Sequence, residues 1–401
     1  MNKVLEKCLV EVEKYSARNY KPLPVVLTQG KGVWVKDVTG KKYLDCLSSY
    51  SALNQGHRHP KIIQALKKQA DKITVSSRAF HNDQMGPFLK KLCQACDMEM
   101  ALPMNTGTEA VETAIKSARK WGYLVKKVPA NRAEIIVCQN NFHGRTVTIV
   151  SFSTEAQYRE DFGPFTPGFV SIPYGDIDAL KKAINPNTVG FIFEPIQGEG
   201  GVVIPREGYW TEAQKVCREN KVLFIADEIQ TGLGRTGKLF CYQHEKEVKP
   251  DMLIVGKALG GGVYPVSAVV ASKEILGLYR PGDHGSTFGG NPLGAAVAIA
   301  SLDVILKEKL AQRSEKMGKY FLGKLKKIKS PHVKEVRGKG LMIGIEIHAS
   351  SGTARPFCEK LADLGVLAKD THDQVIRFMP PLVITKKEID WALQRIEKVL
   401  K

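Results

Sequence analysis

Between residues 104 and 290, short apolar runs alternate with segments of helical spacing. Strands with one wet face alternate apolar and polar residues, whereas strands buried on both faces are apolar throughout. The runs follow the second pattern: "EIIVC" (134–138), "VGFIFE" (189–194), "VLFIA" (222–226) and "MLIV" (252–255). We therefore expect an α/β fold with a doubly wound, mostly parallel sheet covered by helices.

The two ends of the chain follow other patterns. The first residues predict a helix whose apolar stripe we expect to pack on the body of the protein: Leu5, Cys8, Leu9 and Val12. Residues 26–45 predict a hairpin with its turn at Thr39-Gly40. After residue 300, a long helix, the strand "GLMIGIEI" (340–347) and a C-terminal helix predict a smaller α+β unit.

These patterns predict three regions. Residues 1–48 form an N-terminal segment that contributes to the small domain and the active site. Residues 49–295 form the large domain, and residues 296–401 form the C-terminal small domain.

Composition narrows the class of protein. The chain has 401 residues, of which 43% are hydrophobic and 25% charged, as in soluble globular proteins. The first residues lack the apolar core of a signal peptide, so we expect none, and no apolar run comes near the roughly 20 residues that span a bilayer. Its eight cysteines follow no framework, which favours free thiols in the cytoplasm.

The formal net charge of +18 raises the alternative of a nucleic-acid or membrane surface. The densest basic stretch, residues 313–340, carries an apolar helix face formed by Met317, Tyr320, Phe321, Leu325 and Ile328. Lysines fill the other side, as on a solvated helix. We expect neither nucleic acid nor membrane as a partner, and a nucleic-acid-binding or scaffold protein stays a remote alternative.

Two motifs suggest metal or redox chemistry. Cys93 and Cys96 form a CxxC, but they lie on the apolar stripe of a helical segment and predict packing. His57 and His59 lack a cysteine or carboxylate at ligand spacing. We expect no metal site.

Each of the four predicted strands ends in a polar, glycine-rich loop. Ligands of open α/β sheets bind at the carboxyl ends of strands, so these loops predict one shared site. "GLGRTG" (232–237) lacks the register of a dinucleotide-binding G-x-G-x-x-G, which argues against a dinucleotide enzyme.

Lys257 and Asp227 lie at two of these strand ends. Desolvation would free the lysine amine as a Schiff-base nucleophile. A buried Asp227 needs a cation, either Lys257 in a structural ion pair or a ligand. A lysine with an aspartate on a pyridinium nitrogen is typical of pyridoxal 5'-phosphate. Thr106 and Glu109 match a capping box, and the following helix would bind the phosphate.

The motifs "FHGRT", "EPIQGEGG", "ADEIQTGLGRTG", "GKALGGG" and "GDHGSTFGGNP" occur in that order along the chain. They resemble those of the class III aminotransferases, fold-type-I enzymes that use pyridoxal phosphate. The resemblance covers nearly the whole chain. It implies a small α+β domain built from both chain ends, and a homodimer with shared active sites.

The resemblance implies a role for each motif residue. Lys257 would bond the cofactor and shuttle protons, and Asp227 would pair with its ring nitrogen. The remaining cofactor-binding residues would be Gly107, Thr108, Phe142, Gln230, Ser286 and Thr287. Phe142 would stack on the ring, Gln230 would lie near its phenolic oxygen, and Thr287 would reach the phosphate of the neighbouring subunit.

Further stretches, among them "NYKPLPVVL", "LSSYSALNQGH" and "RFMPPLVI", resemble the ornithine-using branch of this family. That branch moves the δ-amino group of ornithine to 2-oxoglutarate; the acetylornithine- and 4-aminobutyrate-using branches are alternatives. The implied substrate-binding residues are Tyr20, Tyr50, Arg145, Glu199 and Arg377. Arg145 would bind the α-carboxylate of ornithine and Tyr20 its α-amino group, while Glu199 would neutralise Arg377.

Overall fold

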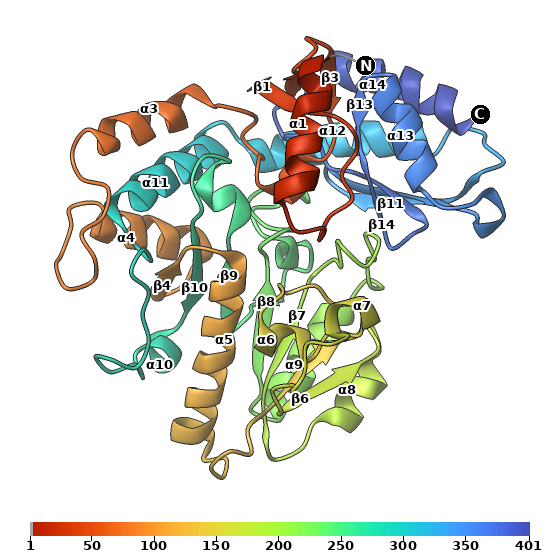
Figure 1. The fold of residues 1–401 in the computed structure, drawn as a ribbon. Coiled ribbons are helices and arrows are strands. Elements are labelled where there is room, and N and C mark those ends of the chain that lie inside the picture. Colours follow the sequence, from red (N-terminus) through yellow and green to blue (C-terminus); the bar gives the residue numbers. More distant parts are fainter. Residues whose placement is uncertain (1–2) are drawn as a thin grey trace.

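The structure, a computed structural model, describes residues 3–401 and is built around a seven-stranded sheet (Figure 1). The strand order is β4-β10-β9-β8-β7-β5-β6. The strands are β4 (Met100–Met104), β5 (Glu134–Cys138), β6 (Phe169–Ile172), β7 (Thr188–Phe193), β8 (Leu223–Asp227), β9 (Met252–Val255) and β10 (Ser267–Ala271). Strand β10 alone runs in the direction opposite to that of the other six strands, so the predicted mostly parallel sheet is confirmed.

Helices cover both faces of this sheet, because consecutive strand residues point to opposite sides. Phe224 and Leu253 pack in a cluster with residues of α4, α9 and α11. Ile225 and Ile254 pack on the other side with residues of α5 and α6. The helices of this part are α3 (Pro60–Ala70), α4 (Met85–Cys96), α5 (Gly107–Trp121), α6 (Val147–Val150), α7 (Ala156–Arg159), α8 (Ile177–Ala183), α9 (Tyr209–Glu219), α10 (Lys273–Leu276) and α11 (Pro292–Lys307). Because neither face of the sheet is exposed to solvent, its strands are apolar throughout.

Two smaller sheets lie beyond the carboxyl ends of the large sheet, in the upper part of Figure 1. The first joins both ends of the chain: β1 (Leu27–Lys31), β2 (Trp34–Asp37) and β3 (Lys42–Asp45) continue into β13 (Val366–Leu367). The second consists of β11 (Val333–Lys339), β12 (Met342–Ile347), β15 (Val375–Phe378) and β14 (Lys369–Thr371). The predicted hairpin is confirmed as β2 and β3, which pair antiparallel.

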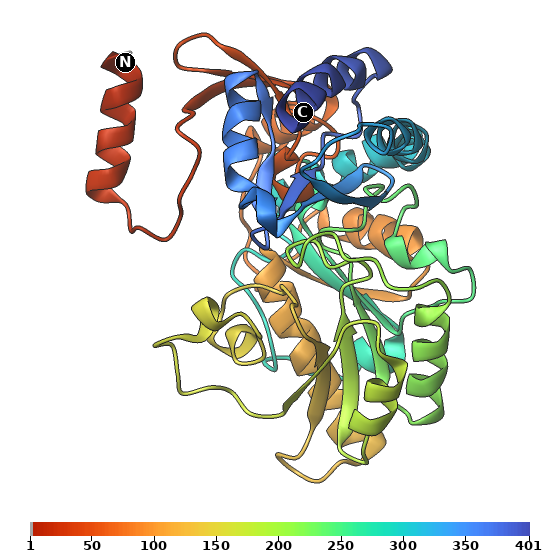
Figure 2. The same ribbon diagram turned by 90° about the vertical axis from the view of Figure 1, so that its right-hand side faces the viewer.

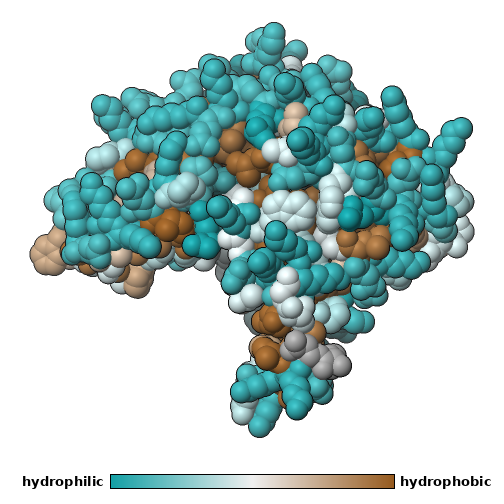
Figure 3. Space-filling model, turned by 90° about the horizontal axis from the view of Figure 1, so that it is seen from above, coloured by the Kyte–Doolittle hydropathy of each residue, from teal (hydrophilic) through white to brown (hydrophobic). Residues whose placement is uncertain are grey.

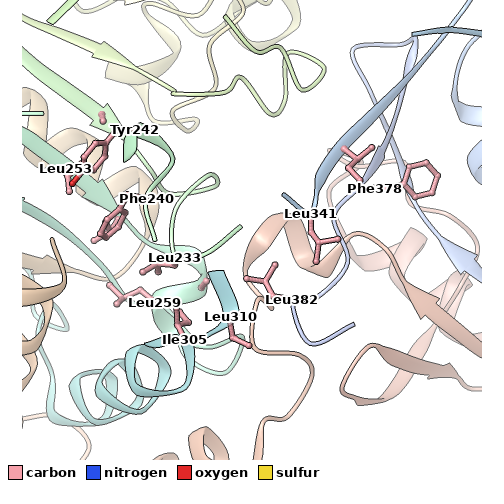
Figure 4. Packing of buried hydrophobic residues seen from close by; sticks show 14 of the residues in the cluster. Leu233, Phe240, Tyr242, Leu253, Leu259, Ile305, Leu310, Leu341, Phe378 and Leu382 are labelled. Carbon is pink, nitrogen blue, oxygen red and sulfur yellow. The ribbon is translucent and has the colours of Figure 1, made fainter. Parts of the chain in front are cut away.

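The C-terminal sheet packs against α12 (Leu310–Leu325), α13 (Arg355–Asp363) and α14 (Lys386–Leu400). One continuous apolar cluster joins this region to the large sheet: Leu259 and Ile305 belong to the same cluster as Leu341 and Leu382 (Figure 4). The predicted region boundaries after residues 48 and 295 stay predictions.

The N-terminal helix forms as predicted, but it does not pack on the body of this chain. Helix α1 (Lys3–Tyr15) has no buried residue and stands away from the rest of the molecule (Figure 2). Val12, a member of its apolar stripe, is 59% exposed. The end of the helix and the connection that follows it are exposed from residue 10 to residue 22. This exposed connection leads the helix away from the sheets.

The remaining expectations about packing are confirmed. Cys93 and Cys96 are free thiols within α4, and Cys96 is buried. In α12, Phe321 and Leu325 are buried, while Lys319 on the other side is 79% exposed at its side chain. Hydrophilic residues cover most of the face seen from above (Figure 3). Within residues 3–401, no helix combines the length and the apolar character needed to cross a membrane.

Helix α12 approaches the turn before β12 so closely that position 318 requires glycine. A Cβ atom on Gly318 would lie 2.0 Å from the carbonyl oxygen of Gly340. We predict that Gly318→Ala lowers the free energy of unfolding by about 1–3 kcal/mol, because backbone must move. Gly323→Ala on the same helix is the control, since its Cβ would meet nothing within 4 Å. The control should stabilise by up to about 1 kcal/mol. Urea unfolding measures both, and equal stabilities would contradict the prediction.

Candidate active site

A cavity of about 210 Å³ lies at the carboxyl ends of β5, β7, β8 and β9. As expected from the sequence, the loops after all four strands contribute to one site, together with the start of α5. The lining residues are Thr106, Gly107, Thr108, Phe142, His143, Gly144, Glu194, Glu199, Asp227, Ile229, Gln230, Thr231 and Lys257.

Lys257 comes two residues after the end of β9 and lines this cavity with its backbone in the left-handed region, at a φ of 44°. Non-glycine residues hold this conformation at a cost, and such strain is common at functional sites. Burial lowers the pKa of the Lys257 amine, although the charges of Glu199 and Asp227 act in the opposite direction. A larger fraction of the side chain is therefore the neutral amine, the form that attacks a carbonyl carbon.

Asp227 ends β8 and is buried, and its cationic partner is a residue that the sequence interpretation did not include. His143 Nδ1 donates to Asp227 Oδ2 at 2.7 Å, and the amide of Ile229 donates to Oδ1 at 3.0 Å. Lys257 forms no ion pair within residues 3–401, so the alternative of a structural Lys257–Asp227 pair is wrong. The signal for His143 was its place beside Phe142 in the loop after β5.

His143 is buried completely, with its side chain against Asp227. Burial alone would lower the pKa of His143, but the hydrogen bond to Asp227 and the charge of that carboxylate raise it overall. The hydrogen bond from His143 fixes the carboxyl group of Asp227, which lines the cavity.

Glu194, after the last residue of β7, is a second carboxylate that the sequence interpretation overlooked. It accepts a hydrogen bond from the amide of Phe142 at 2.9 Å and so fixes the start of the loop that carries His143. Burial raises the pKa of Glu194 to about 7, despite the nearby charge of His143. Its signal was the same as that of Asp227: a carboxylate where a buried strand ends.

The start of α5 has the expected capping box. The Glu109 amide donates to Thr106 Oγ1 at 3.2 Å, and the Thr106 amide donates to Glu109 Oε2 at 2.8 Å. Gly107 and Thr108 come next and line the cavity. Within the described residues their amides have no protein acceptor, and the N-terminal dipole of a helix favours an anion. This end of the cavity suits a phosphate.

The opposite end of the site contains a buried ion pair. Arg377 on β15 donates two hydrogen bonds to Glu199, from Nη1 to Oε1 at 2.7 Å and from Nη2 to Oε2 at 3.2 Å. Gln230 Nε2 donates to the same Oε1 at 3.1 Å. Although burial opposes ionisation, the charge and hydrogen bonds of Arg377 lower the pKa of Glu199 to about 2. The ring of Tyr50 lies 5.1 Å from the Arg377 guanidinium.

Arg145 differs from Arg377, because it is exposed and has no carboxylate partner within residues 3–401. Its guanidinium lies 4.3 Å from the ring centre of Tyr158 and 5.8 Å from that of Phe142. Cation–π contacts hold the group in place and leave its charge without a carboxylate partner. Arg145 therefore remains available for the carboxylate of a ligand. Tyr158, on α7, was also missed from the sequence.

Six of the expected site residues do not line the cavity: Tyr50, Arg145 and Arg377, which are described above, and Tyr20, Ser286 and Thr287. Tyr20 is 72% exposed, although it lies near enough to Tyr50 to influence the pKa of that phenol. Ser286 Oγ accepts from Asn105 Nδ2 at 2.8 Å and from the Gly289 amide at 3.1 Å. Thr287 is exposed. Thr287 was expected to reach the phosphate of the neighbouring subunit, and that role stays a prediction.

The residues of the cavity fit pyridoxal phosphate. The amine of Lys257, the carboxylate of Asp227 and the amides at the start of α5 match its aldehyde, ring nitrogen and phosphate. Among the residues that line the cavity, two buried polar side-chain atoms have no partner within residues 3–401: His143 Nε2 and Gln230 Oε1. Unsatisfied buried atoms are rare in proteins and are commonly found where a ligand binds. Gly198 allows Gln230 its position, because a Cβ atom there would lie 1.5 Å from Gln230 Oε1.

The chain is similar to known proteins over nearly its whole length. The model of the class-III aminotransferase family matches residues 15–400. The chain is 63% identical over 390 residues to an ornithine aminotransferase of Brevibacillus brevis, covering 97% of each protein. An ornithine aminotransferase structure from Toxoplasma gondii, with partial occupancy of PLP at its active site, has a TM-score of 0.97 and 46% identity. That match covers 99% of this chain and 94% of the other.

An acetylornithine aminotransferase from Elizabethkingia anophelis is similar as well, with a TM-score of 0.89 and 47% identity. This match covers 99% of the present chain and 98% of that structure. The fold-type-I architecture expected from the sequence is thus shared by solved aminotransferases of two substrate specificities. A family model that spans nearly the whole chain, together with relatives of this similarity, shows that the chain belongs to the class-III aminotransferases.

Proposed function

We propose that the protein transfers the δ-amino group of L-ornithine to 2-oxoglutarate, giving glutamate 5-semialdehyde and glutamate. The observation that carries this proposal is that Arg377 is paired with Glu199, whereas Arg145 has no carboxylate partner within residues 3–401. An enzyme with this arrangement has one arginine ready for a carboxylate and a second one neutralised in reserve. The similarity to ornithine aminotransferases supports the same substrate.

The cavity residues would divide the work of transamination. When bound, pyridoxal phosphate supplies the electron sink for the substrate carbon that loses its proton. Asp227 would hold the proton on the ring nitrogen, and the hydrogen bond from His143 would keep the carboxyl group of Asp227 in position. The amine of Lys257 would take up and return the proton of the substrate carbon. Phe142 would stack on the ring, and Gly107 and Thr108 would bind the phosphate.

Selection of the δ-amine would depend on the two arginines. Arg145 would bind the α-carboxylate of ornithine, and Tyr20 and Tyr50 would contact the same end of the substrate. Glu199 would neutralise Arg377 meanwhile, so that no second carboxylate is attracted close to Lys257. With 2-oxoglutarate, Glu199 would move away and Arg377 would bind the α-carboxylate in a bidentate manner.

The first prediction concerns Lys257. The purified protein should absorb visible light through its cofactor, and ornithine should change that spectrum. Lys257→Ala should abolish both the change and turnover, because the nucleophile and proton carrier are lost. Spectra recorded with ornithine, N-acetylornithine and 4-aminobutyrate provide the comparison. Full activity of the variant would refute the role of Lys257. A spectral change with N-acetylornithine alone would show that N-acetylornithine, and not ornithine, is the substrate.

A second prediction concerns the reserve arginine. Glu199→Ala should expose the charge of Arg377 and increase the use of α-amines such as glutamate relative to ornithine. The loss of a charge-assisted contact of about 1.5–3 kcal/mol corresponds to a shift in preference of about ten- to a hundredfold. Half-reaction kinetics with each amino donor measure it. Glu212→Ala, which removes an exposed partner of Arg206, is the control. An unchanged preference would place the selection elsewhere.

We also propose a homodimer in which each active site is completed by the other subunit. The exposure of Thr287 and of Phe288, which is 47% exposed, supports a contact outside this chain. Thr287→Asp should inactivate the enzyme by bringing a carboxylate to the partner's phosphate. Co-expressed Lys257→Ala and Thr287→Asp chains should regain part of the activity, since mixed dimers contain one intact site. A fully active monomer in sedimentation experiments would disprove the proposal.

A further inference from the structure

The segment between α1 and β1, residues 16–26, is termed the N-terminal strap. It runs from the detached helix α1 back to the body of the chain (Figure 2). Residues 16–22 are all exposed, so apolar packing does not hold this half of the strap. Its position must therefore depend on specific hydrogen bonds.

Arg355, at the start of α13, supplies those hydrogen bonds. Its Nη1 donates to the carbonyl oxygen of Lys21 at 3.0 Å, and its Nη2 donates to that of Pro22 at 3.1 Å. Within the described chain, these are the hydrogen bonds that join residues 17–24 to the body. Two adjacent carbonyls bound by one planar guanidinium fix the direction of the strap as well as its distance.

Arg355 is itself held in place, with only 20% of its side chain exposed. Its Nε donates to Glu359 Oε1 at 2.8 Å, one helical turn further along α13. Its Nη1 lies 3.9 Å from Asp370 Oδ1 on β14. These two carboxylates orient the guanidinium toward the strap, so the arginine works as a preformed clamp.

The clamp lies beside the substrate end of the active site. Tyr20 directly precedes Lys21, whose carbonyl is bound. In strand β14, Lys369 pairs with Arg377 of β15, and Thr371 Oγ1 donates to the carbonyl oxygen of Glu199 at 2.6 Å. Burial raises the pKa of Tyr50, and Glu199, Tyr20 and Asp370 add to this effect, so these groups surround one space.

We propose that Arg355 is a positioning residue that fixes the strap so that Tyr20 reaches the amino-acid end of the bound donor. The inference rests on the proposed use of ornithine, because Tyr20 would contact the amino group that does not react. A donor without that group would gain nothing from the clamp. Arg355 touches neither substrate nor cofactor and acts only through the strap.

Limited trypsin digestion of the holoenzyme tests the clamp without any substrate. The strap contains one accessible trypsin site, after Arg18, because the bond after Lys21 precedes Pro22. Arg355→Gln should be cleaved after Arg18 at least about fivefold faster than the unmodified protein, since the strap opens more often. Arg355→Lys, which keeps the charge but not the fork, should fall between them. Arg206→Gln, which removes an exposed arginine that contacts neither the strap nor α13, is the control and should retain slow cleavage. Equal rates for all four proteins would overturn the proposal.

Half-reaction kinetics then test the link to the donor. Arg355→Gln should raise the KM for ornithine by about tenfold, the effect of a lost charge-assisted contact, with little change in kcat. The 2-oxoglutarate half-reaction should be unaffected, whereas a general structural defect would slow both half-reactions. Faster cleavage with an unchanged ornithine KM would overturn the positioning role. If the unmodified enzyme does not use ornithine at all, the proposed function fails, while the digestion still decides whether the clamp exists.

Discussion

Burial of both faces of the large sheet is the constraint on which the site depends. A strand residue in its interior points toward one layer of helices or the other, as Phe224 and Ile225 do. Ionisable groups can therefore be placed only where strands end, and the parallel strands end at the same edge. Asp227, Glu194 and Lys257 occupy such positions. The same burial that makes the sheet stable confines its chemistry to one small cavity.

Within that cavity, the protonation of each carboxylate depends on its partners. Burial opposes the ionisation of Glu199 and of Glu194, yet the pKa of Glu199 falls to about 2 and that of Glu194 rises to about 7. The difference follows from Arg377, which gives Glu199 a bidentate cation, whereas Glu194 receives one amide hydrogen bond. The negative charge of Glu199 is therefore fixed, whereas that of Glu194 can change, and both residues lie near Lys257.

The apolar pattern was sufficient to predict the sheet, because buried strands carry their own signal. The limits of β5 and β9 agree with the predicted runs to the residue. The apolar pattern did not predict which side chains distant in sequence pair with one another. His143 and Asp227 are separated by 84 positions, and Glu199 and Arg377 by 178. The first pair was missed, and the second was expected only from the family resemblance. Helix α1 shows a different limit, since an amphipathic stripe predicts a covered face but not which surface covers it.

The pairing of β3 with β13 has a consequence for the synthesis of the protein. Leu44 lies beside Val366, so one of the first strands to leave the ribosome pairs with one of the last. The large sheet can assemble earlier from nearer segments, whereas the N-terminal strands must wait for almost the entire chain. Strand β15, which contains Arg377, and the strap, which carries Tyr20, therefore reach their final positions together at the end of folding. A newly made chain would gain the ability to hold the cofactor before it gained the ability to choose among amines.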